Sequence, residues 1–489
     1  MYQNWTLYNF IHLQDWWDMS NSDLLRSGAH WAGQEMGHVQ LGDARRTARL
    51  VRVTAALAQN PNGTLPSTFT DWKDLRAAYR LFAEPDVTHD AIVAPHGLRV
   101  GQACQAPGQY LLVEDTTTLS FNTHAATTQL GPVNDQGGRG ILVHNTLALR
   151  VASWDRDQVP TVTVLGLAGQ HCWSRPKVAL KRIQKSKEGR LGRARESARW
   201  AVSLPVGPPA RAGVQWIYVA DRESDIYEVF ERCVARGAEW VIRAAQARAL
   251  LAEDHSVFTA VAQASVRGHL ILELRARPGQ PARTLRAALR ACTVTLRAPW
   301  RPGGPLAART LQVVEVRELN PPAGTKPLVW VLLTSLPIRT LAQIKRVVGC
   351  YTQRWLAEEF HKALKSGTQM EASQLATGRA LQALCAVLSL VALRLLETKL
   401  YARAFPDEPV APGQFAPELL RLLAAKWGCP SAGWTQRTVW RGIARCGGFL
   451  GRLGDGEPGW ITIWRGWRSL LNMVEGVVLY RKKGTQTCG

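Results

Sequence analysis

The chain has 489 residues, which is enough for several domains with full cores, and 46% of them are hydrophobic, which excludes a disordered protein. The 60 Lys and Arg residues exceed the 38 Asp and Glu residues and give a net charge of +22, which indicates a polyanionic partner, most simply a nucleic acid. Nine cysteines without a Cys-x-x-Cys pair exclude a zinc ribbon and a disulfide framework, and indicate a reducing compartment.

The N-terminus lacks the pattern of a secretory signal, and the longest apolar run, residues 383–393, is shorter than the roughly 20 residues that a membrane span needs. We therefore expect a soluble, cytoplasmic protein without a membrane partner.

The first predicted elements are two basic helices. Asp43 is placed to cap a helix that ends at 61–63, and a second helix is expected from Trp72 to Phe82. The first helix carries four arginines at three- and four-residue steps on one face: Arg45, Arg46, Arg49 and Arg52. Two short helices with basic faces indicate a DNA-binding unit, although an ordinary helical cap with solvated arginines has the same pattern.

From residue 108 onward, short apolar strands alternate with helices, which predicts a mixed or parallel sheet. Strands are expected at 110–117, 142–151, 161–167, 215–221, 239–243 and 328–334, and helices at 177–204, 226–236, 341–365 and 379–400. Alternating segments between 245 and 325 predict an antiparallel β insertion. The fold class is therefore a multidomain α/β protein.

The C-terminal tail is predicted to be helical. Its apolar residues recur in alternating steps of four and three at Trp460, Trp464, Trp467, Leu471, Val474 and Val478. Such a stripe packs against another helix, either within the chain or across a dimer interface.

Two acidic residues close predicted strands, Asp115 in the segment EDTTTLS and Asp221 in DRESDI. The ends of strands are where α/β folds place reactive groups, although either acid alone could be a helix cap or a salt-bridge partner. Two such carboxylates, buried near each other, require a cation, and two Mg²⁺ ions about 4 Å apart would neutralise them.

A third acid lies on the predicted helix 341–365. At about 100° per residue, one arc of about 80° collects Tyr351, Arg354, Glu358, Lys362 and Lys365. A carboxylate for metal beside cations for phosphate oxygens suits phosphoryl transfer on a nucleic acid. Arg354 and Lys362 are also each four residues from Glu358, so surface salt bridges would give the same pattern.

These residues resemble the bacterial DDE transposases of cut-and-paste insertion sequences. The resemblance rests on Asp115, Asp221 and the Tyr-(2)-Arg-(3)-Glu-(6)-Lys spacing from Tyr351 to Lys365, which marks one branch of the family. It extends to flanking segments such as LGDARRTARLV, AAYRLFAEPDVT and ILVHNTLAL, and covers about residues 30 to 480.

The resemblance implies a ribonuclease-H-like core with Asp115, Asp221 and Glu358 as the catalytic and metal-binding triad. It implies that DNA is contacted by Tyr351, Arg354, Lys365 and Arg243. Lys362, from the cationic helix face, and the arginines of the first basic helix are expected to contact DNA as well. In the family, a tryptophan stacks on a base flipped out near the transposon end, and Trp330 is at the matching position. The place of Trp330 in an apolar strand is equally that of a core residue.

The implied organisation has five parts: a DNA-end-binding domain at 1–90, the core at 91–244, the β insertion at 245–327, the rest of the core at 328–400 and a dimerisation region at 401–489. The first 30 residues extend beyond the usual start of the family.

The expected function is that of a DNA transposase. It would bind double-stranded DNA at the terminal repeats of its element, cut them by hydrolysis and a hairpin intermediate, and join the 3′ ends to target DNA. Two Mg²⁺ ions, replaceable by Mn²⁺, are the expected cofactors, and a homodimer in the synaptic complex the expected assembly. No nucleotide cofactor is expected, since the chain lacks a GxxxxGK[ST] motif.

Two alternatives remain from the sequence. One is a ribonuclease-H-like nuclease or resolvase that cuts without strand transfer. The other is a catalytically inactive DNA-binding relative that acts as a repressor. For the transposase, the expected location is the bacterial cytoplasm, in association with the nucleoid.

Overall fold

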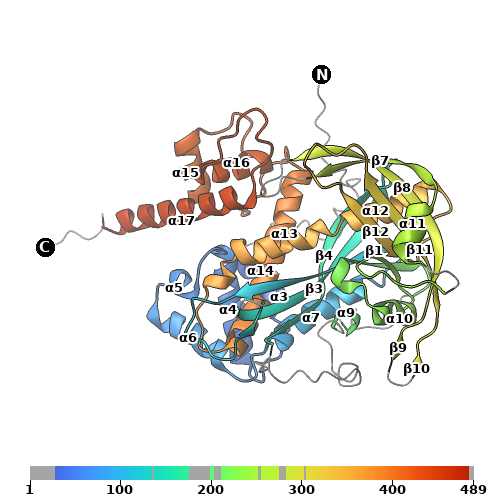
Figure 1. The fold of residues 1–489 in the computed structure, drawn as a ribbon. Helices are drawn as coiled ribbons and strands as arrows, with labels where there is room; N and C mark the ends of the chain where they lie inside the picture. The colour runs from blue at the N-terminus through green and yellow to red at the C-terminus, as the bar shows by residue number, and fades with distance from the viewer. Residues whose placement is uncertain are drawn as a thin grey trace.

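The computed structural model describes residues 28–134, 137–175, 199–202, 211–251, 255–274, 282–301 and 304–483. A large sheet forms the centre, N-terminal helices lie beside one end of it, and three C-terminal helices extend from the body (Figure 1). Most of the charged helix predicted at 177–204 lies outside the described residues, which include only the short helix α9 (Arg199–Val202) from that segment.

The central sheet is mixed, as predicted. Its ten strands run in the order β2-β3-β1-β5-β6-β12-β11-β8-β7, with β4 on β3. Strands β1, β5 and β6 are parallel neighbours, whereas β1 and β3 are antiparallel. The strands are β1 (Gly108–Ser120), β2 (Gly131–Pro132), β3 (Arg139–Trp154), β4 (Pro160–Trp173), β5 (Val214–Ala220), β6 (Glu239–Arg243), β7 (Val266–Leu274), β8 (Arg283–Leu296), β11 (Arg309–Glu318) and β12 (Val329–Thr334).

The predicted antiparallel insertion is confirmed, but it does not form a sheet apart from the core. Strand β11 pairs with β8 on one side and with β12 on the other, so β7, β8 and β11 continue the central sheet. The backbone groups of β12 that face away from β6 are thereby paired instead of exposed at an edge. Strands β9 (Trp300–Arg301) and β10 (Gly304–Pro305) pair with each other in a separate two-stranded ribbon.

Helices cover both faces of the sheet. One face carries α12 (Leu341–Thr352), α13 (Trp355–Lys362) and α14 (Gly378–Ala404), and the other carries α10 (Tyr227–Ala235) and α11 (Val257–Gln263). Helix α14 is long and apolar enough to cross a membrane, but 78% of its apolar stretch is buried, as expected for the core helix of a soluble protein. The bounds of α14 confirm the helix predicted at 379–400.

Helix α7 (His89–Ala103) has no counterpart in the sequence prediction. It contains Pro95 and Gly97, which disfavour a helix interior, and its apolar pattern is weak. Tertiary packing overrides these local preferences, because α7 is held between β4 and α14.

The single helix predicted at 341–365 is wrong, because it is interrupted. Helix α12 ends at Thr352, and the amides of Gln353 and Arg354 bond to carbonyls three residues back, which tightens the last turn. Helix α13 follows and runs into a π-helical turn, Ala363–Gly367.

The N-terminal helices are α3 (Gly28–Met36), α4 (Ala44–Gln59), α5 (Leu65–Thr68) and α6 (Trp72–Ala83), and the two predicted helices are confirmed. The side chain of Asp43 accepts the amide of Arg45 and caps α4, as predicted. Asp71 caps α6 in the same way.

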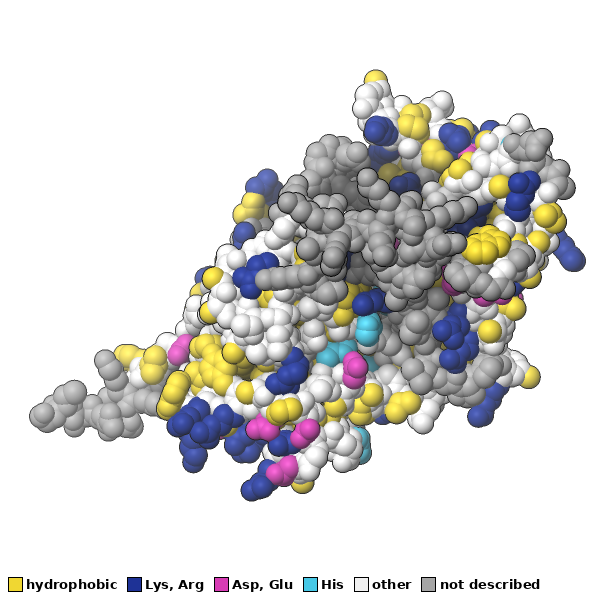
Figure 2. All heavy atoms as spheres, turned by 60° about the horizontal axis from the view of Figure 1, so that its bottom comes forward, with side chains coloured by type: hydrophobic (Ala, Val, Ile, Leu, Met, Phe, Trp, Pro, Cys, Tyr) yellow, Lys and Arg dark blue, Asp and Glu magenta, His cyan; other side chains and the backbone are white. Residues whose placement is uncertain are grey.

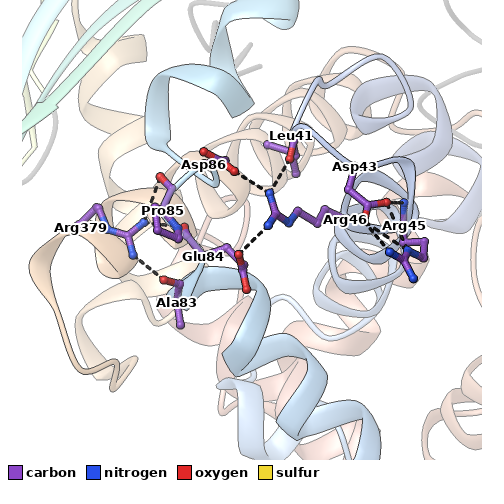
Figure 3. Close-up of polar contacts among 9 residues, drawn as sticks. All are labelled: Leu41, Asp43, Arg45, Arg46, Ala83, Glu84, Pro85, Asp86 and Arg379. Atoms are coloured by element: carbon purple, nitrogen blue, oxygen red, sulfur yellow. Dashed lines mark hydrogen bonds and ion pairs between the residues drawn. The ribbon is translucent and has the colours of Figure 1, made fainter.

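Arg46 fastens α4 to the segment after α6 (Figure 3). Its guanidinium donates to the Leu41 carbonyl at 3.0 Å, to Asp86 at 2.6 Å and to Glu84 at 2.7 Å. Arg379, near the start of α14, donates to the carbonyls of Ala83 and Glu84. The segment 83–86 is thus held between the N-terminal helices and the core.

The C-terminal helices are α15 (Pro417–Trp427), α16 (Gln436–Cys446) and α17 (Trp460–Lys483), and the far end of α17 extends away from the body (Figure 1). Trp460 and Trp464, which begin the predicted apolar stripe, are buried and stacked with ring centroids 4.9 Å apart. The first part of the stripe therefore packs within the chain.

A buried ion pair joins α17 to the core. The Glu359 carboxylate on α13 is 5% exposed and accepts from Lys399 of α14 at 2.7 Å, from the indole of Trp460 at 2.9 Å and from Lys362 at 3.0 Å. Burial alone would raise the pKa of Glu359, but Lys399 and Lys362 outweigh burial and lower the pKa to about 2.

We expect Arg46→Ala to lower the Tm of the protein measurably, because it leaves Glu84 and Asp86 without their shared cation and removes a contact to Leu41. Arg45→Ala is the matched control, since its side chain is 92% exposed and contacts only Asp43 among the described residues. Differential scanning calorimetry distinguishes the two, and equal Tm values would contradict the role given to Arg46.

Glu359→Ala should lower the free energy of unfolding by roughly 3–5 kcal/mol, because it leaves the Lys399 ammonium buried without a counter-charge. Lys362→Ala should cost less than about 1 kcal/mol, since Lys362 is 56% exposed. Urea unfolding measures both. In the wild type, the contribution of the Glu359 carboxylate to the free energy of unfolding is complete above about pH 4.5 and is lost as the pH falls toward about 2. Equal losses in the two variants would contradict this assignment.

Candidate active site

The parallel pairing of β1 and β5 brings two of the predicted acids together. Val113 lies opposite Val219 in the last pair of the β1–β5 ladder, and Asp115 and Asp221 each follow two residues later. Asp221 directly follows β5, as predicted, whereas Asp115 does not close its strand, because β1 continues to Ser120 in its pairing with β3. Because side chains alternate along a strand, both carboxylates point to the same face as Val113 and Val219, which is the face that α13 covers.

Arg354 joins Asp115 to the third acid. Its guanidinium contacts the Asp115 carboxylate (Nη1 to Oδ2) at 3.1 Å, and its other terminal nitrogen contacts the Glu358 carboxylate. The predicted salt bridge between Arg354 and Glu358 is therefore present, and the contact to Asp115 is an addition that the helical arc did not predict. Asp115 lies on β1 and Glu358 on α13, so Arg354 bridges strand and helix.

The site is short of positive charge. Burial raises the pKa of Asp115 to about 6; Arg354 opposes this shift, and the charges of Asp221 and Glu358 add to it. Burial disfavours the charged form of Arg354, but Asp115 and Glu358 outweigh burial and raise its pKa. One guanidinium among three carboxylates leaves a net negative site lined with carboxylate oxygens, the ligands that Mg²⁺ and Mn²⁺ prefer.

In the described ranges, no three His, Cys, Asp or Glu side chains lie close enough together to hold a metal ion in this conformation. Arg354 instead links Asp115 and Glu358. Asp221 accepts the amide of Glu223 at 3.0 Å and caps the short turn Arg222–Ser224, so the cap suggested by the sequence is also present. The donor set fits a divalent cation, provided that Arg354 gives up its contacts.

Tyr351 and Trp330 pack against each other. Tyr351 is buried, and Trp330 on β12 is half-buried, with its ring edge-on to Tyr351 at a centroid distance of 5.1 Å. Trp330 also packs against the main core, so one part of its ring is that of a core residue, as the alternative interpretation expected.

Two predicted DNA contacts line cavities. Lys365 is half-buried and borders a polar cavity of about 560 Å³ together with His124 and Gln369. Arg243 donates to the Val329 carbonyl at 3.1 Å and borders a second cavity of about 450 Å³, which also contains Arg222. Arg222 directly follows Asp221 in the chain, but none of the three acids lines this cavity.

Other predicted cations are engaged in ion pairs. Lys362 pairs with Glu359, three residues earlier, whereas the Glu358 carboxylate is held by Arg354. Among the N-terminal arginines, Arg46 is held by internal contacts and Arg49 pairs with Asp74, while Arg52 is exposed. Lys and Arg side chains are spread over the face in Figure 2, and Asp and Glu are far fewer, in keeping with the net charge of +22.

The sequence interpretation missed His361 and Asn145. The His361 imidazole (Nδ1) lies 4.0 Å from the Asp115 carboxylate (Oδ2), and the Asn145 amide contacts Nε2 of the same ring at 3.0 Å. Burial lowers the pKa of His361 to about 3, so the ring is neutral. The available signal was the polar pair His144-Asn145 within an apolar strand, together with the place of His361 three residues after Glu358.

Three protein-family models match the chain, and together they cover more than half of it. A transposase DNA-binding family matches residues 28–87, which are the N-terminal helices. The transposase DDE domain matches residues 213–394, which include Asp221 and Glu358, and the transposase Tn5 dimerisation domain matches residues 419–487.

These matches agree with the architecture: an α/β core of the ribonuclease-H-like kind between a DNA-binding N-terminal region and a helical dimerisation region. A DDE domain is that of a metal-dependent enzyme that cuts and transfers DNA. The chain therefore belongs to the DDE transposases of insertion sequences, of the Tn5-like kind, and is a DNA transposase.

Proposed function

We propose that Asp115, Asp221 and Glu358 are the catalytic and metal-binding triad of this transposase. The observation that carries the proposal is the proximity of the three carboxylates: the pairing of β1 with β5 brings Asp221 near Asp115, and Arg354 contacts both Asp115 and Glu358. The raised pKa of Asp115 supports it, since the single guanidinium of Arg354 does not offset burial and the charges of Asp221 and Glu358.

The cations that fit these oxygen ligands are two Mg²⁺ ions, for which Mn²⁺ would substitute. Bound there, divalent ions supply Lewis acidity, which activates water or a 3′-hydroxyl and stabilises charge on the phosphate. The three carboxylates would hold the ions in place of Arg354. Arg354, once free of the carboxylates, offers a planar pair of donors that matches phosphate oxygens.

The DNA end would lie along the surface beside the triad. Lys365 and Arg243, which border the two cavities, would contact phosphates, as would Tyr351 and Lys362 on the signature segment. Trp330 would stack on an unpaired base with the part of its ring that does not contact Tyr351. On the basis of the signature spacing, we propose that the chain belongs to the Tyr-Arg-Glu-Lys branch.

At the level of the reaction, we propose nicking of the transposon end, hairpin formation, release of the element and joining of its 3′ ends to target DNA. The exposed arginines of α4 would contact the terminal repeat, and a homodimer would hold two ends in one synaptic complex. The division into 1–90, 91–244, 245–327, 328–400 and 401–489 belongs to the same proposal. Its β insertion shares the core sheet.

Alanine at Asp115, Asp221 or Glu358 should abolish cleavage and joining of a linear DNA that carries the element's ends, with a loss of at least about 1,000-fold, because each variant removes a metal ligand. Binding of the same DNA in a gel-shift assay should persist. Denaturing gels in Mg²⁺ and in Mn²⁺ measure cleavage and strand transfer separately.

Glu223→Gln is the matched control, since Glu223 lies two residues from Asp221 and outside the triad; it should cut and join normally. Full activity of any triad variant would refute the assignment. Cleavage by the wild type without joined products would favour the nuclease, and end binding without cleavage would favour the repressor.

Metal binding should weaken below about pH 6, because Mn²⁺ must displace the proton of Asp115, whose pKa is about 6. We expect a roughly tenfold loss of affinity per pH unit on the acidic side. In Arg354→Gln the loss should begin at a higher pH, since removing the guanidinium raises the pKa of Asp115 further. Titration of Mn²⁺ by electron paramagnetic resonance at several pH values measures both, and constant affinity between pH 5 and 8 would contradict the prediction.

A further inference from the structure

A row of polar side chains continues the acidic site across the sheet. Register places Asn145 of β3 opposite Asp115 of β1, and Gln170 of β4 opposite Asn145. Asp221, directly after β5, extends this line, so that β4, β3, β1 and the end of β5 each contribute one polar side chain. Strands β1, β3 and β4 lie side by side, with α13 over this face (Figure 1).

At the end of the row that lies away from the acids, Gln170 is held by hydrogen bonds. The Gln170 amide nitrogen donates to the Asn145 carbonyl oxygen at 2.6 Å and to the hydroxyl of Ser389 on α14 at 2.9 Å. The Gln170 carbonyl oxygen contacts the imidazole Nε2 of His89, on α7, at 3.0 Å. The amide of Gln170 is therefore fixed from two helices.

These contacts determine which nitrogen of His361 carries the proton. Since the Asn145 oxygen accepts from Gln170, its amide nitrogen donates to Nε2 of His361. An accepting Nε2 leaves the ring proton on Nδ1, which is the nitrogen that faces Asp115 Oδ2 at 4.0 Å. Asn145 is 1% exposed, so water does not compete for these bonds.

We propose that Asn145 is a positioning residue of the transposase reaction, which acts through His361 to hold the Asp115 carboxylate in the orientation that binds metal. Nδ1 of His361 faces Asp115 Oδ2 at 4.0 Å and would donate to it once Arg354 leaves this oxygen. Oδ1, which accepts the Thr116 amide at 2.9 Å, would face the ion. Partners of this kind, one step removed from the metal, commonly change metal affinity or activity by 10- to 100-fold when they are lost. The inference rests on the proposed role of Asp115 as a metal ligand.

The experiment measures Mn²⁺ affinity without DNA, by electron paramagnetic resonance of the free ion, beside DNA cleavage and Tm. Asn145→Leu keeps the branched shape of the side chain but removes both hydrogen bonds, and should weaken Mn²⁺ binding by roughly 10- to 100-fold. His361→Asn retains an N–H near the place of Nδ1 and should bind Mn²⁺ better than His361→Ala does.

Thr334→Val is the matched control. Its hydroxyl is fully buried in the same sheet and makes two hydrogen bonds, with the Trp240 carbonyl and the Leu336 amide, away from the acids. It should lower the Tm without changing Mn²⁺ affinity. If Asn145→Leu lowers the Tm to the same extent and binds Mn²⁺ as the wild type does, Asn145 is only structural and the inference fails.

Two further results separate this inference from the site assignment. Asp115→Ala should lose Mn²⁺ binding; if it does not, the assignment of the triad fails. If Asp115→Ala loses binding while His361→Asn and His361→Ala both bind normally, the triad holds and the positioning role is overturned. If Asn145→Leu does not fold, the comparison of His361→Asn with His361→Ala still tests the positioning role.

Discussion

The repulsion among Asp115, Asp221 and Glu358 is the constraint on which the rest of the site depends. Two of these carboxylates are brought together by strand pairing, which cannot relax without breaking backbone hydrogen bonds. Without a metal, Arg354 supplies the compensating charge, and it contacts Asp115 and Glu358 at once. The short break between α12 and α13 places Arg354 there. The guanidinium of Arg354 thus lies at the place where the proposed metal ions would bind.

Local patterns predicted much of the fold, because they act over a few residues. The Asp43 cap and most strands followed from neighbouring residues, and the triad followed from a resemblance carried by fixed spacing. Helix α7 could not be predicted, because its packing on β4 and α14 overrides Pro95. The same limit applies to the break at Gln353 and to the continuation of the sheet through β11, which depend on partners far away in sequence.

The contacts of the site residues likewise divide into local ones, which the sequence predicts, and long-range ones, which it does not. Arg354 and Glu358 are four residues apart, so their contact could be read from helix geometry, whereas the contact of Arg354 with Asp115 spans 239 residues. Asn145 and Gln170 lie in strands that look apolar from the sequence. Their importance depends on strand register, which a single sequence does not reveal.

The carboxylate of Glu359, directly beside Glu358, has consequences for how the protein is made. Its partners are Lys399 and Trp460, so the helix that carries the third acid is fully anchored only after almost the whole chain has left the ribosome. Until then a carboxylate that becomes buried in the finished fold lacks its indole donor. The enzyme is therefore completed late in synthesis, and a product truncated before residue 460 would hold its helix α13 less firmly.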